Sequence, residues 1–174
     1  MQSDSTRICY RPMKSGEEAL IADLVFGVFA EFVEPLYSQE GVEQFKKFAC
    51  ADALADRLGA GNLFLLAESG QRIIGVIEVR EHSHVGLLFV EKSFQREGIA
   101  RELLGRSIEI CRRQNPGIRK ITVNSSPNAI AAYQRIGFTT VEEEQLQNGM
   151  RFVPMELTLD NNGGNRRVKS ADAG

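Results

Sequence analysis

The fold is decided by residues 84–104, whose sequence is HVGLLFVEKSFQREGIARELL. The stretch opens as an apolar, β-prone run, which predicts a buried strand. It then crosses a polar turn and enters a helix at Gly98, and Pro116-Gly117 ends that helix. Apolar residues recur on one helix face at Ile99, Leu103, Leu104, Ile108 and Cys111. The sequence therefore predicts a strand, a turn and an amphipathic helix.

The turn before this helix has the features of an anion-binding site. The first N–H groups of a helix have no intrahelical partner, and the helix dipole places partial positive charge behind them. Gly98 has no Cβ, so a phosphate can approach its backbone closely. No Lys-Ser/Thr pair follows Gly98, which excludes a Walker loop, and a Rossmann fingerprint would need three glycines.

What does fit is the pattern Gln/Arg-x-x-Gly-x-Gly/Ala, which Gln95 to Ala100 matches at every fixed position. These residues resemble the acetyl-CoA pyrophosphate loop of the GNAT N-acetyltransferases, although a plain strand-turn-helix connection could carry the same pattern. A second stretch, ITVNSSPNAIAAYQRIGF at residues 121–138, resembles the family's second acetyl-CoA motif. Its strand ends in Asn124, and Tyr133 stands four residues before Gly137-Phe138. The Asn-Ser-Ser-Pro of this stretch and the run Arg151 to Leu157 are similar to a bacterial-type subgroup.

The resemblance implies a mixed α/β (α+β) domain with the GNAT fold over residues 1–159. Its central sheet would be mostly antiparallel, flanked by helices, and splayed between the central strand at residue 84 and the strand that follows the helix. The polar segment 160–174 has no periodicity and is interpreted as a disordered tail.

Patterning predicts the remaining elements. A helix should begin at a capping box, Ser15 to Glu18, and end at Glu34-Pro35. A second helix should run from about Gly41 to Leu58. Gly86 inside the central strand predicts a bulge or a close backbone approach. The other strands are expected at residues 6–10, 62–68, 72–80, 139–145 and 151–159, the last two joined by a turn at Asn148-Gly149.

The resemblance also implies the activity, which is direct attack of a primary amine on the acetyl-CoA thioester, and we expect the amine to belong to a small molecule. The backbone of Leu88, Phe89 and Val90 would hold the pantetheine arm of acetyl-CoA. The pyrophosphate would lie on the loop residues Gln95, Arg96, Glu97, Gly98, Ile99, Ala100 and Arg101. Asn124 would contact the cofactor or the substrate amide, and Tyr133 would be the general acid toward the departing thiolate.

The general base is the open question at this stage. His84 stands where histone-type relatives carry a catalytic Glu, and its unperturbed pKa near neutrality suits proton removal. Glu78 on the preceding strand is the second candidate, and a purely structural hydrogen bond of His84 is the alternative. Glu31, Glu34 and Tyr37 are expected near the acceptor amine, where carboxylates could hold a cation; the alternative is that they form a solvated surface.

The composition of the chain argues against several other classes of protein. The 174 residues are 43% hydrophobic with a net charge of −2, which gives no global basic surface for nucleic acid. Three scattered cysteines, without metal-ligand spacing, favour a reducing cytoplasm over disulfides. No metal site, signal peptide or membrane span is expected, and a homodimer is allowed. Protein acetylation and a non-catalytic acetyl-CoA-binding module are the rival hypotheses.

Overall fold

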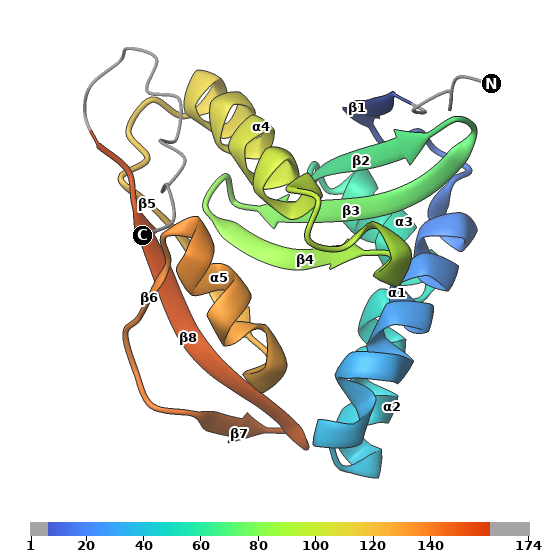
Figure 1. Cartoon of the computed structure of the whole chain (residues 1–174), viewed down its shortest axis with the longest axis vertical. Coiled ribbons are helices and arrows are strands. Elements are labelled where there is room, and N and C mark those ends of the chain that lie inside the picture. The colour runs from blue at the N-terminus through green and yellow to red at the C-terminus, as the bar shows by residue number, and fades with distance from the viewer. Residues whose placement is uncertain (1–6, 161–174) are drawn as a thin grey trace, which may run out of the picture.

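A computed structural model of the chain describes residues 7–160 (Figure 1). Apart from Asp160, the predicted tail at residues 160–174 therefore lies outside the described residues. The strands are β1 (Ile8–Pro12), β2 (Leu63–Ser69), β3 (Arg72–Arg80), β4 (His84–Val90), β5 (Lys120–Ser125), β6 (Thr139–Thr140), β7 (Gln145–Gln147) and β8 (Met150–Thr158). The α-helices are α1 (Glu18–Phe32), α2 (Gln39–Ala49), α3 (Ala51–Gly59), α4 (Ile99–Gln114) and α5 (Ile130–Ile136). Short 3-10 turns are η1 (Glu34–Leu36), η2 (Lys92–Phe94) and η3 (Pro127–Ala129).

The strands form one sheet in the order β1-β2-β3-β4-β5-β8-β6, with β7 paired to β8 at its far end. Strands β4 and β5 are parallel and every other pair is antiparallel, which confirms the predicted mixed sheet. Helices α4 and α5 cover one face, and α1, α2 and α3 cover the other (Figure 1). Strand β3 supplies both cores: Ile74 and Ile77 pack on the α4 side, whereas Ile73 and Val76 pack on the α1 side, and a register irregularity at Ile74 breaks the simple alternation.

The prediction of one helix over residues 41–58 was wrong, because the chain breaks at Cys50. Cys50 has an extended backbone (φ −69°, ψ 158°) and separates α2 from α3. The break redirects the chain so that Leu54 is fully buried against the sheet and Arg57 reaches Glu78 on β3. A continuous amphipathic pattern cannot reveal such a change of direction.

The capping box at Ser15 was also wrong. Helix α1 begins at Glu18, with Glu17 at the N-cap and no side-chain cap bond, because Gly16 adopts a left-handed backbone (φ +98°) that interrupts the helix. The Glu18 carboxylate accepts a hydrogen bond from the Gly16 N–H at 2.8 Å, one residue after the Ser15 N–H that a capping box would use.

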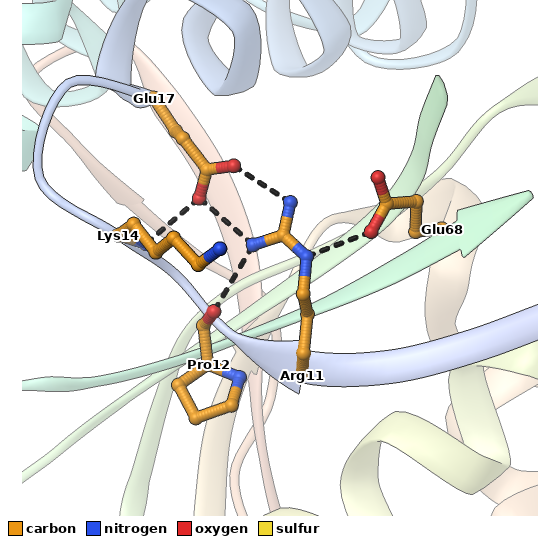
Figure 2. Close-up of polar contacts among 5 residues, drawn as sticks. All are labelled: Arg11, Pro12, Lys14, Glu17 and Glu68. Atoms are coloured by element: carbon orange, nitrogen blue, oxygen red, sulfur yellow. Dashed lines mark hydrogen bonds and ion pairs between the residues drawn. The ribbon is translucent and has the colours of Figure 1, made fainter. Parts of the chain in front are cut away.

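An ion-pair network fixes the start of α1 against the sheet (Figure 2). The Arg11 guanidinium donates to Glu17 at 2.6 and 3.0 Å and to Glu68 at 2.7 Å. Glu17 also accepts the Lys14 N–H at 2.7 Å. The two carboxylates raise the pKa of Arg11, and Arg11 in turn lowers the pKa of Glu17. The network ties β1, β2 and α1 together outside the functional site.

The C-terminal strands differ from the prediction in one respect. The expected strand over 139–145 is two short strands, β6 and β7, separated by the exposed acidic run Glu142 to Glu144. Three adjacent carboxylates are unfavourable in a strand, since like charges repel and Glu is a poor strand former. The predicted turn at Asn148-Gly149 is confirmed: both residues have positive φ, 50° and 77°, the geometry of a two-residue hairpin.

Candidate active site

Strands β4 and β5 separate after two paired positions, and the gap between them opens into a cleft. Their register includes only His84 with Thr122 and Val85 with Val123. Beyond Val85 the edge of β4 that faces β5 has no strand partner, so its backbone groups are available to a ligand. The cleft has a volume of about 970 Å³ and is lined on one side by β4, β5, the start of α4 and α5, and on the other by α1 and α2. This is the predicted splay.

The predicted bulge in β4 is confirmed at Gly86. Glu78 pairs with Leu87 and Val79 with Val85, which leaves Gly86 as the extra residue. A Cβ at Gly86 would lie 3.4 Å from the Glu78 carboxylate, so glycine gives that buried group room. After the bulge, Leu88 and Val90 pack toward α4, whereas Leu87 and Phe89 pack toward α1 and α2.

The loop between β4 and α4 forms the end of the cleft that an anion would use. The Gln95 side-chain amide donates to the Val90 carbonyl at 3.0 Å and holds the loop against the strand. Arg96 and Gly98 have positive φ, 66° and 80°, which curls the backbone around Glu97. The first helical bond of α4 runs from the Glu102 N–H to the Gly98 carbonyl, so the preceding N–H groups point toward the cleft entrance. Nothing lies within 4 Å of a Cβ built on Gly98, so the space above it is open.

Most of the predicted cofactor-binding residues line this cleft. They are Leu88, Phe89, Val90, Gln95, Arg96, Gly98, Ile99, Ala100, Arg101, Asn124 and Tyr133. Glu97 is exposed and does not line the cleft, which keeps its carboxylate away from the proposed pyrophosphate position. The Arg101 guanidinium donates to the Arg135 carbonyl at 2.8 Å and so connects α4 to the last turn of α5.

Tyr133 projects from α5 into the cleft. Its ring packs edge-on against Phe138, with centroids 5.2 Å apart, and the residue is 8% exposed. Among residues 7–160 no side chain is bonded to its hydroxyl; since no buried side-chain oxygen in that range lacks a partner, the hydroxyl is open to the cleft. Burial raises the pKa of Tyr133 well above 10, so the phenol stays protonated at physiological pH. The hydroxyl is therefore a hydrogen-bond donor free for a ligand.

The two candidate bases lie outside the lining of the cleft. His84 occupies the closed end of the splay, where its Nδ1 lies 2.8 Å from the Thr122 hydroxyl. Burial, and then the positive charge of Arg80, lower the pKa of His84. Glu78 is fully buried; its carboxylate accepts from Arg57 at 2.7 and 3.1 Å and from Asn62 at 2.7 Å. Both side chains thus have protein partners in this structure.

Sequence reasoning missed part of the cleft lining on the α1–α2 side. Phe32 and Phe45 line the cleft together with Tyr37 and Phe89, but an apolar residue at helical spacing is ordinarily interpreted as core. Of the three residues expected near the acceptor, Tyr37 is in the cleft lining, whereas Glu31 and Glu34 are not. Among residues 7–160 no three His, Cys, Asp or Glu side chains gather as metal ligands. None of the helices in that range is long and apolar enough to cross a membrane.

Comparisons with known proteins agree with this geometry. The chain is similar in structure to a GCN5-related N-acetyltransferase from Rhodopseudomonas palustris, with a TM-score of 0.75 and 20% identity over 87% of this chain and 95% of that one. It is also similar to the PaiA N-acetyltransferase of Thermoplasma acidophilum in complex with coenzyme A, with a TM-score of 0.73 and 18% identity over 88% and 99%. A direct sequence comparison with curated proteins finds no significant match.

The splayed sheet and the loop at the start of α4 define the class of protein as an acetyltransferase-type domain. The sequence model described as "Acetyltransferase (GNAT) domain" matches residues 33–159, most of the chain. The chain belongs to the GNAT acetyltransferase family, and acetyl-CoA is its co-substrate.

Proposed function

We propose that the protein transfers the acetyl group of acetyl-CoA to the nitrogen of a primary amine, and that the acceptor is a small molecule. The observation that carries the proposal is the Tyr133 hydroxyl, a donor without a partner in residues 7–160, in the wall of the cleft between the α4 loop and the acceptor side. A module that only bound acetyl-CoA would not need a donor at that position.

The bond changes are simple. The neutral amine nitrogen forms a bond to the thioester carbonyl carbon, the carbon–sulfur bond breaks, and coenzyme A leaves as a thiolate. The nitrogen then loses one proton to become the amide, and one proton converts the thiolate to the free thiol. The phosphate loop at Gly98 and the unpaired edge of β4 would hold acetyl-CoA in place. Tyr133 would donate a hydrogen bond to the sulfur as charge develops on it, and its high pKa favours this over full proton transfer.

Loss of the amine's proton is the step with the least support from side chains. His84 and Glu78 stay as predicted bases, but each is bonded to a protein group and lies outside the cleft lining. We favour attack by the amine that is already neutral in solution, the ammonium proton going to water. Desolvation of the amine in the cleft, whose lining contains no carboxylate, favours the neutral form as well.

A small acceptor is supported by the rim of the cleft. The N-terminus of α2 meets the β7–β8 turn (Figure 1), where the Ser38 N–H donates to the Gly149 carbonyl at 3.3 Å. Gly41 and Gly149 pack backbone to backbone at this point. This contact, named here the rim latch (Ser38, Gly41 and Gly149), lies outside the cleft lining and ties α2 to the β7–β8 turn, an arrangement that supports a small acceptor over a folded protein.

Location and assembly are further parts of the proposal. The three cysteines are free, and Cys111 is buried on the inner face of α4. Free thiols support the proposed cytoplasmic location. A homodimer stays a prediction, which analytical ultracentrifugation would test.

The test is an assay of free coenzyme A thiol with acetyl-CoA and a panel of primary amines. Amine-dependent thiol release, together with the acetylated amine by mass spectrometry, is the expected result. If acetyl-CoA binds and no amine of the panel causes thiol release, but a protein substrate is acetylated, then the acceptor is a protein and not a small molecule. Binding without any transfer would favour the non-catalytic module.

A further inference from the structure

The acceptor side of the cleft is built mainly from aromatic rings. Phe32 at the end of α1, Tyr37 after η1, Phe45 on α2 and Phe89 on β4 all line the cleft and are all half-buried. These four side chains are named here the aromatic wall. Val28 and Val33 lie beside them.

The rings of the wall are held in place by one another and by the core. Phe45 stacks on the fully buried Phe29, with centroids 4.0 Å apart and planes 8° from parallel. Phe45 also lies 5.9 Å from Phe89 at a tilt of 52°, and Phe29 meets Tyr37 edge-on at 5.7 Å. Because the rings are fixed, a flat apolar ligand meets a preformed surface and little ordering cost is added on binding.

The distribution of charge around the cleft also favours a ligand with an apolar body. Among the residues that line it there is no Asp or Glu, and its cations, Arg96, Arg101 and Arg135, come from the α4–α5 side. Two carboxylates near the acceptor side are already neutralised by cations, Glu31 by Lys92 and Glu78 by Arg57. A second positive charge on the acceptor would thus lose its hydration without gaining a counter-ion.

We propose that the acceptor is a primary amine whose body is aromatic or similarly flat and apolar, and that the aromatic wall is what selects it. This inference rests on the proposed function. The ring of the acceptor would pack against Phe45 and Phe89, with its amine directed along β4 toward the acetyl group. Polyamines and strongly polar amines would be poor acceptors at the same site.

The experiment compares three amines as acceptors, 2-phenylethylamine, ethanolamine and 1,4-diaminobutane, by kcat/KM at saturating acetyl-CoA. Burial of a phenyl ring predicts a roughly 10- to 100-fold preference for 2-phenylethylamine over ethanolamine, and at least that over 1,4-diaminobutane. Equal or better turnover of 1,4-diaminobutane would overturn the aromatic preference while leaving the proposed acetyl transfer standing. Thiol release with other primary amines of the panel but with none of these three would overturn the aromatic preference alone, whereas release with none of the amines, in a protein that acetyl-CoA still stabilises against heat, would contradict both.

A matched pair of variants on α2 tests the wall itself. Phe45→Leu should raise the KM for 2-phenylethylamine about 3- to 10-fold and leave the KM for acetyl-CoA unchanged. Phe48→Leu is the control, because Phe48 also lies on α2 beside the same cluster but faces Arg57, with the guanidinium 4.0 Å from its ring, and does not line the cleft. The acetyl-CoA thermal shift checks that both variants are folded. Equal effects of the two substitutions on the acceptor KM would show that the wall does not contact the acceptor.

Discussion

The two sides of the cleft are built in different ways. The proposed coenzyme side is centred on a contiguous segment, residues 94–101, most of which lines the cleft and whose left-handed residues Arg96 and Gly98 shape the loop. The acceptor side consists of side chains from α1, α2 and β4, brought together only by the packing of three separate segments. The first is a property of a local backbone path, and the second is a property of the tertiary structure.

This difference explains what each side can do. A phosphate loop needs glycine and backbone donors in a fixed order, so its sequence is constrained over a short stretch. An aromatic wall needs only rings of suitable size at a few distant positions, and each ring can be exchanged singly. We therefore expect the coenzyme side to fix the reaction and the acceptor side to fix the substrate, and four predictions test that division.

The largest effect is expected at Tyr133, which stands between the two sides. Tyr133→Phe removes one hydroxyl and keeps the ring that packs on Phe138. The turnover number should fall by roughly 10²–10⁴-fold, while the KM for acetyl-CoA changes little, because the bond to the thiolate is made mainly in the transition state.

Gln134→Ala is the control for this substitution, since Gln134 is exposed on the same helix and outside the cleft lining. Full turnover in Tyr133→Phe would make Tyr133 a packing residue. Parallel loss of acetyl-CoA binding and turnover would make its hydroxyl a coenzyme anchor instead.

The second-largest effect is expected at Gly98, where a substitution should change acetyl-CoA binding. Gly98→Glu forces a side chain into a left-handed backbone (φ +80°) and places a carboxylate in the open space proposed for the pyrophosphate. At acetyl-CoA one hundredfold above its dissociation constant the wild-type protein should gain about 2.7 kcal/mol, or roughly 5–11 °C in melting temperature, and the variant should gain none.

Gly105→Glu supplies the matched change, because Gly105 lies on the same helix, is exposed and has no atom within 4 Å of a built Cβ. It should keep the full acetyl-CoA shift. If Gly98→Glu keeps the normal acetyl-CoA shift in melting temperature, the loop is not part of the coenzyme site.

The third effect concerns the rim latch on the acceptor side. A Cβ at Gly41 would overlap the backbone carbonyl of Gly149, so Gly41→Ala should cost about 1–3 kcal/mol of unfolding free energy, or roughly 2–12 °C in melting temperature. Acceptor KM should change while the acetyl-CoA dissociation constant does not. Gly27→Ala on α1 meets no atom within 4 Å and should be neutral or stabilising. Weaker acetyl-CoA binding in Gly41→Ala would mean that the two sides are coupled.

The smallest effect is expected at His84, at the closed end of the splay. His84→Gln can still bond the Thr122 hydroxyl, so turnover should fall by less than about 10-fold, below the ~10²–10⁴-fold typical of a lost base. Because folding lowers the pKa of His84, the unfolded chain binds the proton more readily than the folded one. The stabilisation is therefore present above the unfolded pKa of about 6.5 and is lost as the pH falls through the lower folded pKa.

Thermal unfolding between pH 8 and 5 measures that difference. The wild-type melting temperature should fall relative to that of His84→Gln on the acid side. A turnover loss of a hundredfold or more in the variant would instead restore His84 as the general base.

The local signals predicted much of the fold. Strand β3 matches the expected range 72–80, Gly98 is the N-cap of α4, and Asn148 and Gly149, both with positive φ, form the expected turn. These features depend on residues adjacent in the chain. The break at Cys50 could not be predicted, because it serves the contact of Arg57 with Glu78, a residue on a distant strand.

Within the site, too, features set by adjacent residues could be predicted and features set by distant contacts could not. The loop from Gln95 to Ala100 and the position of Tyr133 follow from contiguous motifs, and the structure places them together in one cleft. The sequence around Phe32 and Phe45 contains no local signal that distinguishes a ring that faces a ligand from a ring that faces the core. The partners of His84 and Glu78 likewise come from β5 and α3, which no pattern in their own strands could indicate.

The single extra residue in β4 has an evolutionary consequence. Gly86 shifts the alternation of the strand, so that Leu88 and Val90 face the α4 side while Phe89 belongs to the aromatic wall. A deletion of one residue between Val85 and Leu87 would exchange those two faces along the rest of the strand. Relatives of this protein can therefore diversify their acceptors by substitution at these positions, whereas a change in the length of the strand would alter coenzyme and acceptor binding in one mutational step.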